Sequence, residues 1–137
     1  MITTLGLTHL ALTVGDLQRS FQFYHDVFGM VAVYRDKNFL QAQTPGGRDI
    51  LVLEEGTENV GKSGGIKHFG FQLADARDID SAAAAIESAG GKILRRGEFC
   101  PGEPYVFFAD PDGYEVEVWY ELPMAVDEAL RTLTSPN

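Results

Sequence analysis

The feature that constrains the fold most is an internal repeat, because the chain presents the same series of patterns twice. The stretch GLTHLALTV (6–14) matches GIKHFGFQL (65–73), which places His9 over His68. The turn-and-strand stretch TPGGRDILVLEE (44–55) matches DPDGYEVEVWYE (110–121). A repeat of this length indicates one supersecondary unit used twice, so the two halves are expected to share one architecture.

Each half is predicted to contain a strand, a helix and three further strands. Alternation over 4–14 predicts the first strand. Asp16 suits a helix N-cap and Gly29 a helix end. The remaining elements are expected as strands near 30–36, 38–43 and 48–54, then a strand at 66–73, a helix near 78–89 and strands near 92–96, 104–109 and 114–120.

The resulting fold class is α+β, a single domain over 1–137 built from two βαβββ modules. The first module spans 4–55 and the second 65–121, with a Gly-rich linker between them. The tail, 122–137, is a candidate for a short helix.

Composition limits the partners more than the chemistry. The 137 residues are enough for one core, and 45% hydrophobic against 23% charged residues is typical of a globular protein. A formal net charge of -9 repels nucleic acid and anionic membranes. The single cysteine, Cys100, excludes an internal disulfide. The N-terminus lacks the pattern of a targeting signal. We therefore expect a cytoplasmic protein with neither nucleic-acid nor membrane partners.

Strand alternation places three side chains that can bind a metal on the same side. His9 and His68 occupy equivalent positions, each opposite the apolar residues that must pack against a helix. Glu117 lies on the corresponding face of the last strand. One strand histidine is usually structural or solvated, but two at repeat-related positions beside a carboxylate favour a metal site. His25, on the first helix, has no counterpart and is interpreted as solvated.

The chain resembles the vicinal oxygen chelate superfamily, which includes glyoxalase I, fosfomycin-resistance proteins, type I extradiol dioxygenases and bleomycin-resistance proteins. The stretches that carry the resemblance are THLALTVGDLQRSFQFYHDVFGM (8–30), IKHFGFQLADARDI (66–79) and YVFFADPDGYEVEVW (105–119). The resemblance implies two modules whose mixed sheets curl into a cup around a divalent metal, with the helices outside.

In that superfamily the metal ligands come from the first and last strands of each module. The resemblance therefore implies His9, His68 and Glu117 as ligands, and the turn alignment puts the fourth position on Leu51. Two imidazoles and one carboxylate leave positions open for substrate and suit Fe, Mn, Zn, Ni or Co as the divalent cofactor. Without a fourth protein ligand, Glu117 would have to serve as both ligand and base in an isomerase.

The function implied is a metal-dependent enzyme that chelates a small oxygen-bearing substrate, by lyase, isomerase or ring-cleaving dioxygenase chemistry. The alternative is a metal-free small-molecule binding protein of the bleomycin-resistance kind. Retention of both histidines and Glu117 favours the enzyme, because a sequestering pocket needs none of them.

Alternation also predicts the remaining residues of the site. The resemblance to isomerases and dioxygenases makes Glu117 and Tyr105 the candidate catalytic residues. The expected substrate pocket comprises Phe39, Gln41, Leu51, Leu53, Gln72, Phe107 and Trp119. An apolar wall with a few polar groups is the usual makeup of a small-molecule pocket. Members of the superfamily pair their modules within one chain or between two, so a homodimer is expected with either arrangement open.

Overall fold

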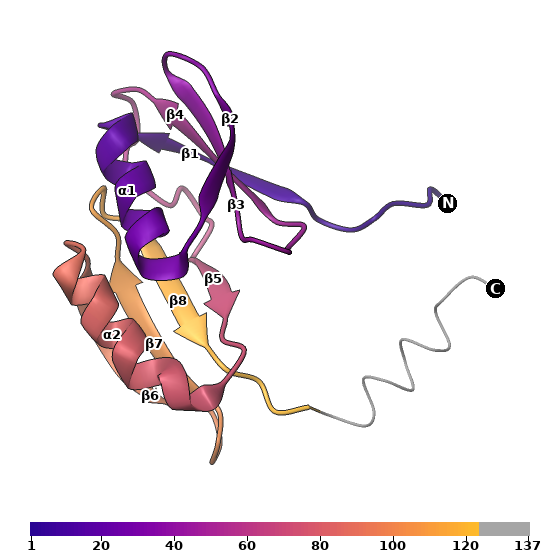
Figure 1. Ribbon diagram of the computed structural model, residues 1–137, viewed down its shortest axis with the longest axis vertical. Coiled ribbons are helices and arrows are strands. Elements are labelled where there is room, and N and C mark those ends of the chain that lie inside the picture. Colours follow the sequence, from indigo (N-terminus) through magenta and orange to yellow (C-terminus); the bar gives the residue numbers. More distant parts are fainter. Residues whose placement is uncertain (124–137) are drawn as a thin grey trace.

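The computed structural model describes residues 1–123, and these form two βαβββ units (Figure 1). The first unit contains β1 (His9–Val14), α1 (Leu17–Phe28), β2 (Val31–Arg35), β3 (Phe39–Gln43) and β4 (Ile50–Glu55). The second contains β5 (Phe69–Gln72), the short 3-10 helix η1 (Ala76–Asp78), α2 (Ile79–Ser88), β6 (Lys92–Glu98), β7 (Pro104–Ala109) and β8 (Glu115–Trp119). The expected α+β fold is therefore confirmed. The helix considered for the tail lies outside the described residues.

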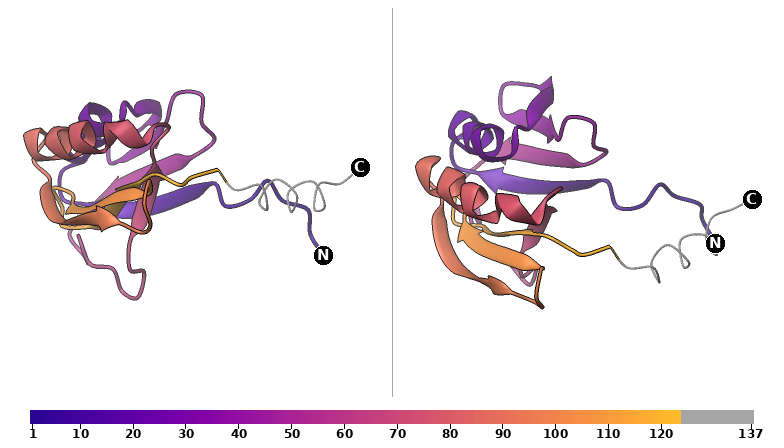
Figure 2. Two further views of the ribbon diagram at one scale, coloured as in Figure 1. Left: turned by 90° about the horizontal axis from the view of Figure 1, so that it is seen from below. Right: turned by 60° about the horizontal axis from the view of Figure 1, so that its bottom comes forward.

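Each unit has one four-stranded mixed sheet with the same strand order. The orders are β1-β4-β3-β2 and β5-β8-β7-β6. In both sheets the first and last strands pair parallel and the other pairs are antiparallel. Both helices lie side by side on one side of the sheets (Figure 2). The opposite faces of the two sheets are left without helices, and they carry the candidate site.

The helix α1 forms where the sequence supplies both of its ends. The Asp16 side chain accepts a hydrogen bond from the Arg19 amide at 3.0 Å, and Gly29 ends the helix in the left-handed conformation at φ 68°. Phe23 and Tyr24 are buried on the face toward the core. His25 is exposed, and its Nδ1 lies 2.9 Å from the Met30 carbonyl oxygen at the helix end.

The two units share one core and are joined by the turn before β8. Tyr24 of α1 donates a hydrogen bond to the buried Asp110 carboxylate at 2.6 Å. Asp112 accepts from the Gly15 amide at 2.9 Å and from the Ser20 hydroxyl. Burial raises the pKa of Tyr24, and the Asp110 charge raises it further. The DPDG turn therefore attaches the second unit to the start and middle of α1.

Two strand boundaries differ from those expected. The strand expected over 4–14 begins at His9, and the strand expected over 66–73 spans only Phe69–Gln72. Pairing of β1 with β4 runs from His9↔Ile50 onward, and residues 1–8 are exposed. Alternation alone cannot detect that no neighbouring strand extends this far. None of the helices in residues 1–123 is long and apolar enough to cross a membrane.

Candidate metal centre

His68 and Glu117 meet on the open face of the second sheet. His68 immediately precedes β5, and Glu117 lies in the middle of β8, paired with Gly70. His68 Nε2 is 3.7 Å from Glu117 Oε2. Gly70 keeps the strands close here, because an added Cβ would lie 3.2 Å from the Glu117 carbonyl oxygen. The two predicted ligands of the second module are thus brought together.

The environment of Glu117 fits a cation. The residue is 8% exposed, and within residues 1–123 no hydrogen-bond donor reaches its carboxylate. Burial raises the pKa of Glu117, while the nearby His68 and Arg95 lower it in part. A buried carboxylate is stable as an anion only when a positive partner compensates its lost hydration. A divalent metal bound jointly by His68 and Glu117 would supply that partner.

His9 lies at the first position of β1 and is exposed. Its Nδ1 is 3.2 Å from the Thr8 hydroxyl, which leaves Nε2 free to bind a ligand. The cavity beside His9, of about 220 Å³, includes neither His68 nor Glu117 in its lining. Within the described part of the chain, no three metal-ligating side chains come together. One chain therefore presents His9 separately from the other two predicted ligands.

The fourth ligand position is corrected by the strand register. Leu51 pairs with Leu10 and Ala42 and is buried at 4% exposure in the core that faces the helices. Its neighbour Val52 pairs with Ala11 and Gln41 on the open face. The alignment of the two turns placed Leu51 over Glu117, which is one residue away from the pairing in the structure. A shift of one residue moves a side chain to the other face of a sheet. The counterpart of Glu117 is thus Val52, which cannot bind a metal either.

The same slip affects another predicted pocket residue. Leu53 is fully buried in the core with Leu51 rather than on the open face. Phe39 and Gln41 are half-buried on β3, opposite Glu54 and Val52. Gln72 is exposed at the end of β5, paired with Trp119. Phe39 and Gln41 thus belong to the open face of the first sheet, and Gln72 and Trp119 to that of the second.

Aromatic side chains cover most of the open face of the second sheet. Phe107 pairs with Glu117 across β7 and β8, and its ring is perpendicular to His68 at 4.9 Å between centroids. Tyr105 lies one row further along, opposite Trp119. Its hydroxyl lies over Gly97 of β6, where an added Cβ would be 2.6 Å away. Because β6 is at the far edge of the sheet from β5, this hydroxyl points away from His68.

Two further residues belong to this face, and strand alternation did not indicate either of them as part of the site. Phe99, in the loop after β6, stacks on Tyr105 at 4.4 Å and extends the aromatic wall. Glu115 has its Oε2 3.9 Å from His68 Nδ1. Two hydrogen bonds from Arg95 to Glu115, at 3.1 and 3.4 Å, lower the pKa of this carboxyl. The Glu115 contact joins segments that are distant in the sequence, and Phe99 lies in a loop, so strand alternation indicates neither contact.

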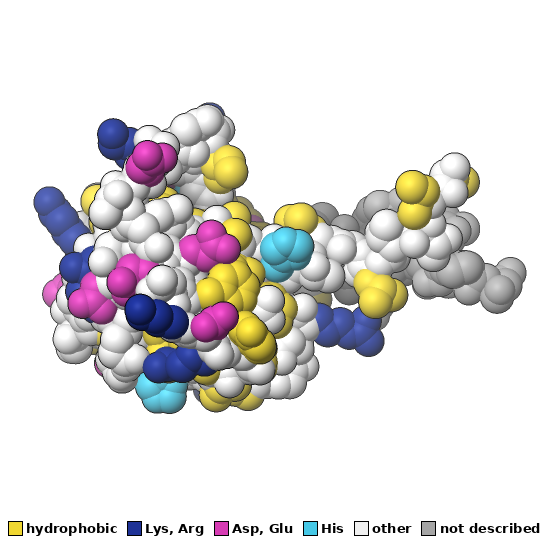
Figure 3. All heavy atoms as spheres, turned by 90° about the horizontal axis from the view of Figure 1, so that it is seen from above, with side chains coloured by type: hydrophobic (Ala, Val, Ile, Leu, Met, Phe, Trp, Pro, Cys, Tyr) yellow, Lys and Arg dark blue, Asp and Glu magenta, His cyan; other side chains and the backbone are white. Residues whose placement is uncertain are grey.

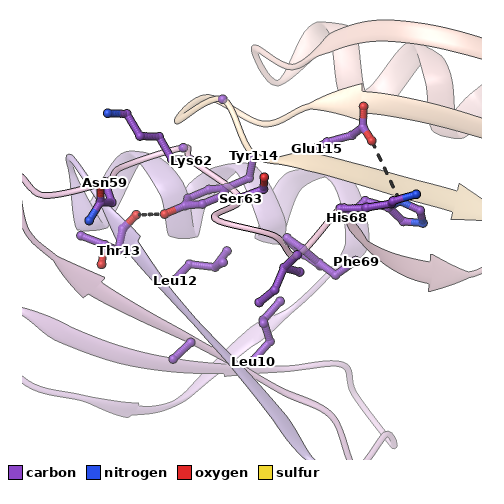
Figure 4. Close-up of a pocket in the computed structure, with 15 residues that line it drawn as sticks. Leu10, Leu12, Thr13, Asn59, Lys62, Ser63, His68, Phe69, Tyr114 and Glu115 are labelled. Carbon is purple, nitrogen blue, oxygen red and sulfur yellow. Dashed lines mark hydrogen bonds and ion pairs between the residues drawn. The ribbon is translucent and has the colours of Figure 1, made fainter.

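A separate cavity of about 460 Å³ lies between β1 and the segment before β5 (Figure 4). Leu10, Leu12 and Thr13 line one side, while His68 and Glu115 stand at its other end. The Tyr114 hydroxyl donates to the Thr13 carbonyl oxygen at 2.6 Å across this junction. A pocket therefore opens beside the histidine at the boundary of the two units.

Comparison with known proteins places these features in a family. A "Probable lactoylglutathione lyase" of Synechocystis sp. is 32% identical over 124 residues, which are 82% of this chain and 92% of that protein. A "Catechol-2,3-dioxygenase" of Bacillus subtilis is 29% identical over 85% of this chain, which spans only 42% of that protein. These relatives catalyse different reactions, so they leave the reaction of this chain open.

Solved structures agree on the fold. A glyoxalase-related enzyme from Fulvimarina pelagi superposes with a TM-score of 0.72 at 23% identity, covering 90% of this chain and 95% of that one. The fosfomycin resistance protein FosX from Mesorhizobium loti gives 0.72 at 19% identity, covering 93% and 99%. Residues 6–118 match the family model described as Glyoxalase/Bleomycin resistance protein/Dioxygenase superfamily. The chain belongs to the glyoxalase/bleomycin resistance protein/dioxygenase superfamily.

Proposed function

We propose that the protein is a metal-dependent enzyme that acts on a small, oxygen-bearing substrate. The observation that carries this proposal is the pair formed by His68 Nε2 and the nearly buried, otherwise unpartnered Glu117 carboxylate at 3.7 Å. Relatives that include lactoylglutathione lyases and a catechol dioxygenase support it. His9, His68 and Glu117 would hold a divalent ion of iron, manganese, zinc, nickel or cobalt, all of which suit this donor set.

When bound, such a metal would polarise two adjacent substrate oxygens and stabilise the negative charge that develops on them. The chain's own residues would do the rest. Glu117 is the carboxylate placed to move a proton near the substrate, since Val52 occupies its counterpart position. Phe107 and Trp119 would exclude water and bind the apolar part of the substrate, while Tyr105 would contact it further from the metal. The reaction is of the lyase/isomerase type or a ring-cleaving dioxygenation.

We further propose that the site is completed between two chains of a homodimer. His9 does not join His68 and Glu117 within residues 1–123. Hydrophobic side chains are also exposed along the N-terminal arm, which projects from the molecule in Figure 3, and on β2. Large exposed apolar surfaces usually mark interfaces. The exposed side chains are Ile2, Leu5, Leu7, Val31, Val33 and Tyr34. The cytoplasm, with its reducing conditions, would suit the free and exposed Cys100.

Metal analysis of the purified protein tests the proposed function. We expect about one transition-metal ion per chain, and its loss in His68→Ala and in Glu117→Ala. His25→Ala removes an exposed histidine at a helix end and should keep the full metal content. Full metal content in both ligand variants would refute the ligand assignment. A wild-type protein that binds no added Fe, Mn, Zn, Ni or Co would instead support the metal-free binding protein.

The reaction type is decided by two assays on the reconstituted protein. Isomerisation of hemithioacetals with Ni or Zn would support the lyase/isomerase branch. Oxygen uptake on catechols after anaerobic loading with Fe(II) would support the dioxygenase branch. Glu117→Gln should abolish whichever activity is found, by at least about 100-fold, because it removes both a ligand and the proton acceptor.

A further inference from the structure

His68 is one of four side chains that form a closed ring of contacts on the open face of the second sheet. Its Nδ1 is 3.9 Å from Glu115 Oε2. Glu115 accepts two hydrogen bonds from Arg95. The Arg95 guanidinium lies over the Phe107 ring, 4.0 Å from its centroid, and Phe107 meets His68 edge-on. Each member of this ring contacts the next, and the last contacts the first.

The two nitrogens of His68 face two different carboxylates. Nε2 faces Glu117 at 3.7 Å, and Nδ1 faces Glu115, as the dashed line in Figure 4 shows. Glu115 and Glu117 are two residues apart on β8, so both project from the same face. A histidine that binds metal through one nitrogen commonly donates the proton of its other nitrogen to a carboxylate, carbonyl or water, which fixes the tautomer and the ring orientation.

Glu115 is itself held in place. Arg95 uses two nitrogens, Nη1 and Nη2, to bind the two carboxylate oxygens at 3.1 and 3.4 Å. This paired geometry and the stacking of the guanidinium on Phe107 restrict the carboxylate more than a single contact would. The side chains are only half exposed, at 51% for Arg95 and 31% for Glu115. Arg95 therefore binds Glu115 of the same chain.

In the first unit, the Nδ1 atom of the histidine has a different kind of neighbour. His9 Nδ1 is 3.2 Å from the hydroxyl of its neighbour Thr8. The β4 residue that pairs with His9 is Ile50, which has no acceptor. The arrangement of Glu115 and Arg95 is therefore particular to the second unit and is not a consequence of the repeat.

We propose that Glu115, anchored by Arg95, is a positioning residue whose carboxylate accepts a hydrogen bond from the Nδ1–H group of His68, which keeps the proton on Nδ1 and leaves Nε2 unprotonated and directed at Glu117. This inference rests on the proposed function, in which His68 Nε2 and Glu117 bind the metal. Glu115 acts through His68 and does not itself contact the substrate. Arg95 acts one step further out, by fixing the carboxylate of Glu115.

The main test compares Glu115→Val with the wild type by two readouts. The first is the dissociation constant for Zn²⁺ alone, measured by competition with a chromogenic chelator. We expect it to rise by about 10- to 100-fold, the usual effect of removing such a partner. The second is the tautomer of His68 in the metal-free protein, read from its ¹⁵N shifts at a pH well above the ordinary histidine pKa. The Nδ1–H form should dominate in the wild type and give way to the Nε2–H form in Glu115→Val.

Matched variants separate this role from a general effect of surface charge. Arg95→Met should weaken Zn²⁺ binding several-fold, whereas Arg96→Met should not, because Arg96 lies on the helix side of the same strand and pairs with Asp80. Asp80→Asn removes a comparable ion pair and should leave both readouts unchanged. Glu115→Gln keeps an acceptor oxygen and should restore the Nδ1–H tautomer.

The outcomes distinguish this inference from the proposed function. If Zn²⁺ binds to the wild type and is lost in His68→Ala, but Glu115→Val changes neither readout, the positioning role is wrong and the metal site stands. If the wild type binds no metal, the proposed function fails. The tautomer measurement then still decides the inference, since an unchanged His68 in Glu115→Val would overturn it.

Discussion

At the scale of single residues, Glu117 stands out because the residue is 8% exposed and its carboxylate accepts no hydrogen bond within the described chain, where His68 and Arg95 offset its burial only in part. Burial raises its pKa. The folded protein therefore retains a proton at this site at pH values where the unfolded chain has lost it. The associated stabilisation is present at low pH and is lost as the pH rises through the raised pKa of the folded state.

Glu117→Gln should consequently stabilise the metal-free protein, and the gain should grow from acidic to neutral pH. We expect about 1 kcal/mol at neutral pH, because the substitution replaces an ionised buried group by a neutral one of the same shape. Urea unfolding in the presence of a chelator, repeated at several pH values, measures the difference. Added Zn²⁺ should reverse the order, since only the wild type would gain stability from binding. A Gln variant that is less stable at every pH would show that the carboxylate has a compensating partner.

At the scale of elements, the close contact between the linker and the turn before β8 sets how the two units meet. Gly61 has φ 76°, and a Cβ there would lie 2.1 Å from the Asp112 carbonyl oxygen. Asp112 in turn binds the start of α1 through the Gly15 amide and the Ser20 hydroxyl. Any residue larger than glycine at position 61 would have to push the turn away from α1.

Gly61→Ala and Gly64→Ala form a matched pair for this contact. Both glycines have positive φ, but a Cβ at Gly64 would meet nothing within 4 Å. Gly64→Ala should therefore cost about 1 kcal/mol for the backbone conformation alone. Gly61→Ala should cost about 1–3 kcal/mol more, because it adds a steric clash. Both free energies of unfolding come from urea titrations, and equal values for the two variants would mean that the linker yields without cost.

At the scale of the whole molecule, the separation of His9 from His68 and Glu117 predicts how ligands are shared. In a dimer whose sites combine the first unit of one chain with the second unit of the other, a His9→Ala chain and a His68→Ala chain complement each other. Their hybrid has one site with both substitutions and one intact site. We expect about one metal ion per hybrid dimer, purified through two different tags, and none in either parent dimer.

A second hybrid dimer tests the other arrangement, in which each metal site is formed within one chain. A chain with both His9→Ala and His68→Ala, paired with a wild-type chain, would have one damaged ligand in each shared site and should bind no metal. If each site belonged to one chain, the same hybrid would keep one metal ion, and the first hybrid would keep none. The two hybrids thus give opposite results for the two arrangements.

The sequence by itself determined the repeated βαβββ order, the ends of α1 and the common face of His68 and Glu117. These features depend on residue periodicity, helix caps and turn residues, which are local properties of the chain. The sequence alone therefore predicted the helix caps Asp16 and Gly29 and the face of β8 on which Glu117 lies. The pocket residues on β7 and β8 share the face that alternation predicted, although their roles in binding stay predictions.

Only the tertiary structure decided the register of β4, the start of β1 and the neighbours of His68. Val52 rather than Leu51 lies on the open face because strand pairing with β1 and β3, not turn similarity, sets the register. Glu115 reaches His68, and Arg95 reaches Glu115, from strands that are far apart in the chain, so no local pattern indicates these contacts. Pairings between distant segments depend on how the whole chain packs, and that is why the sequence left them undetermined.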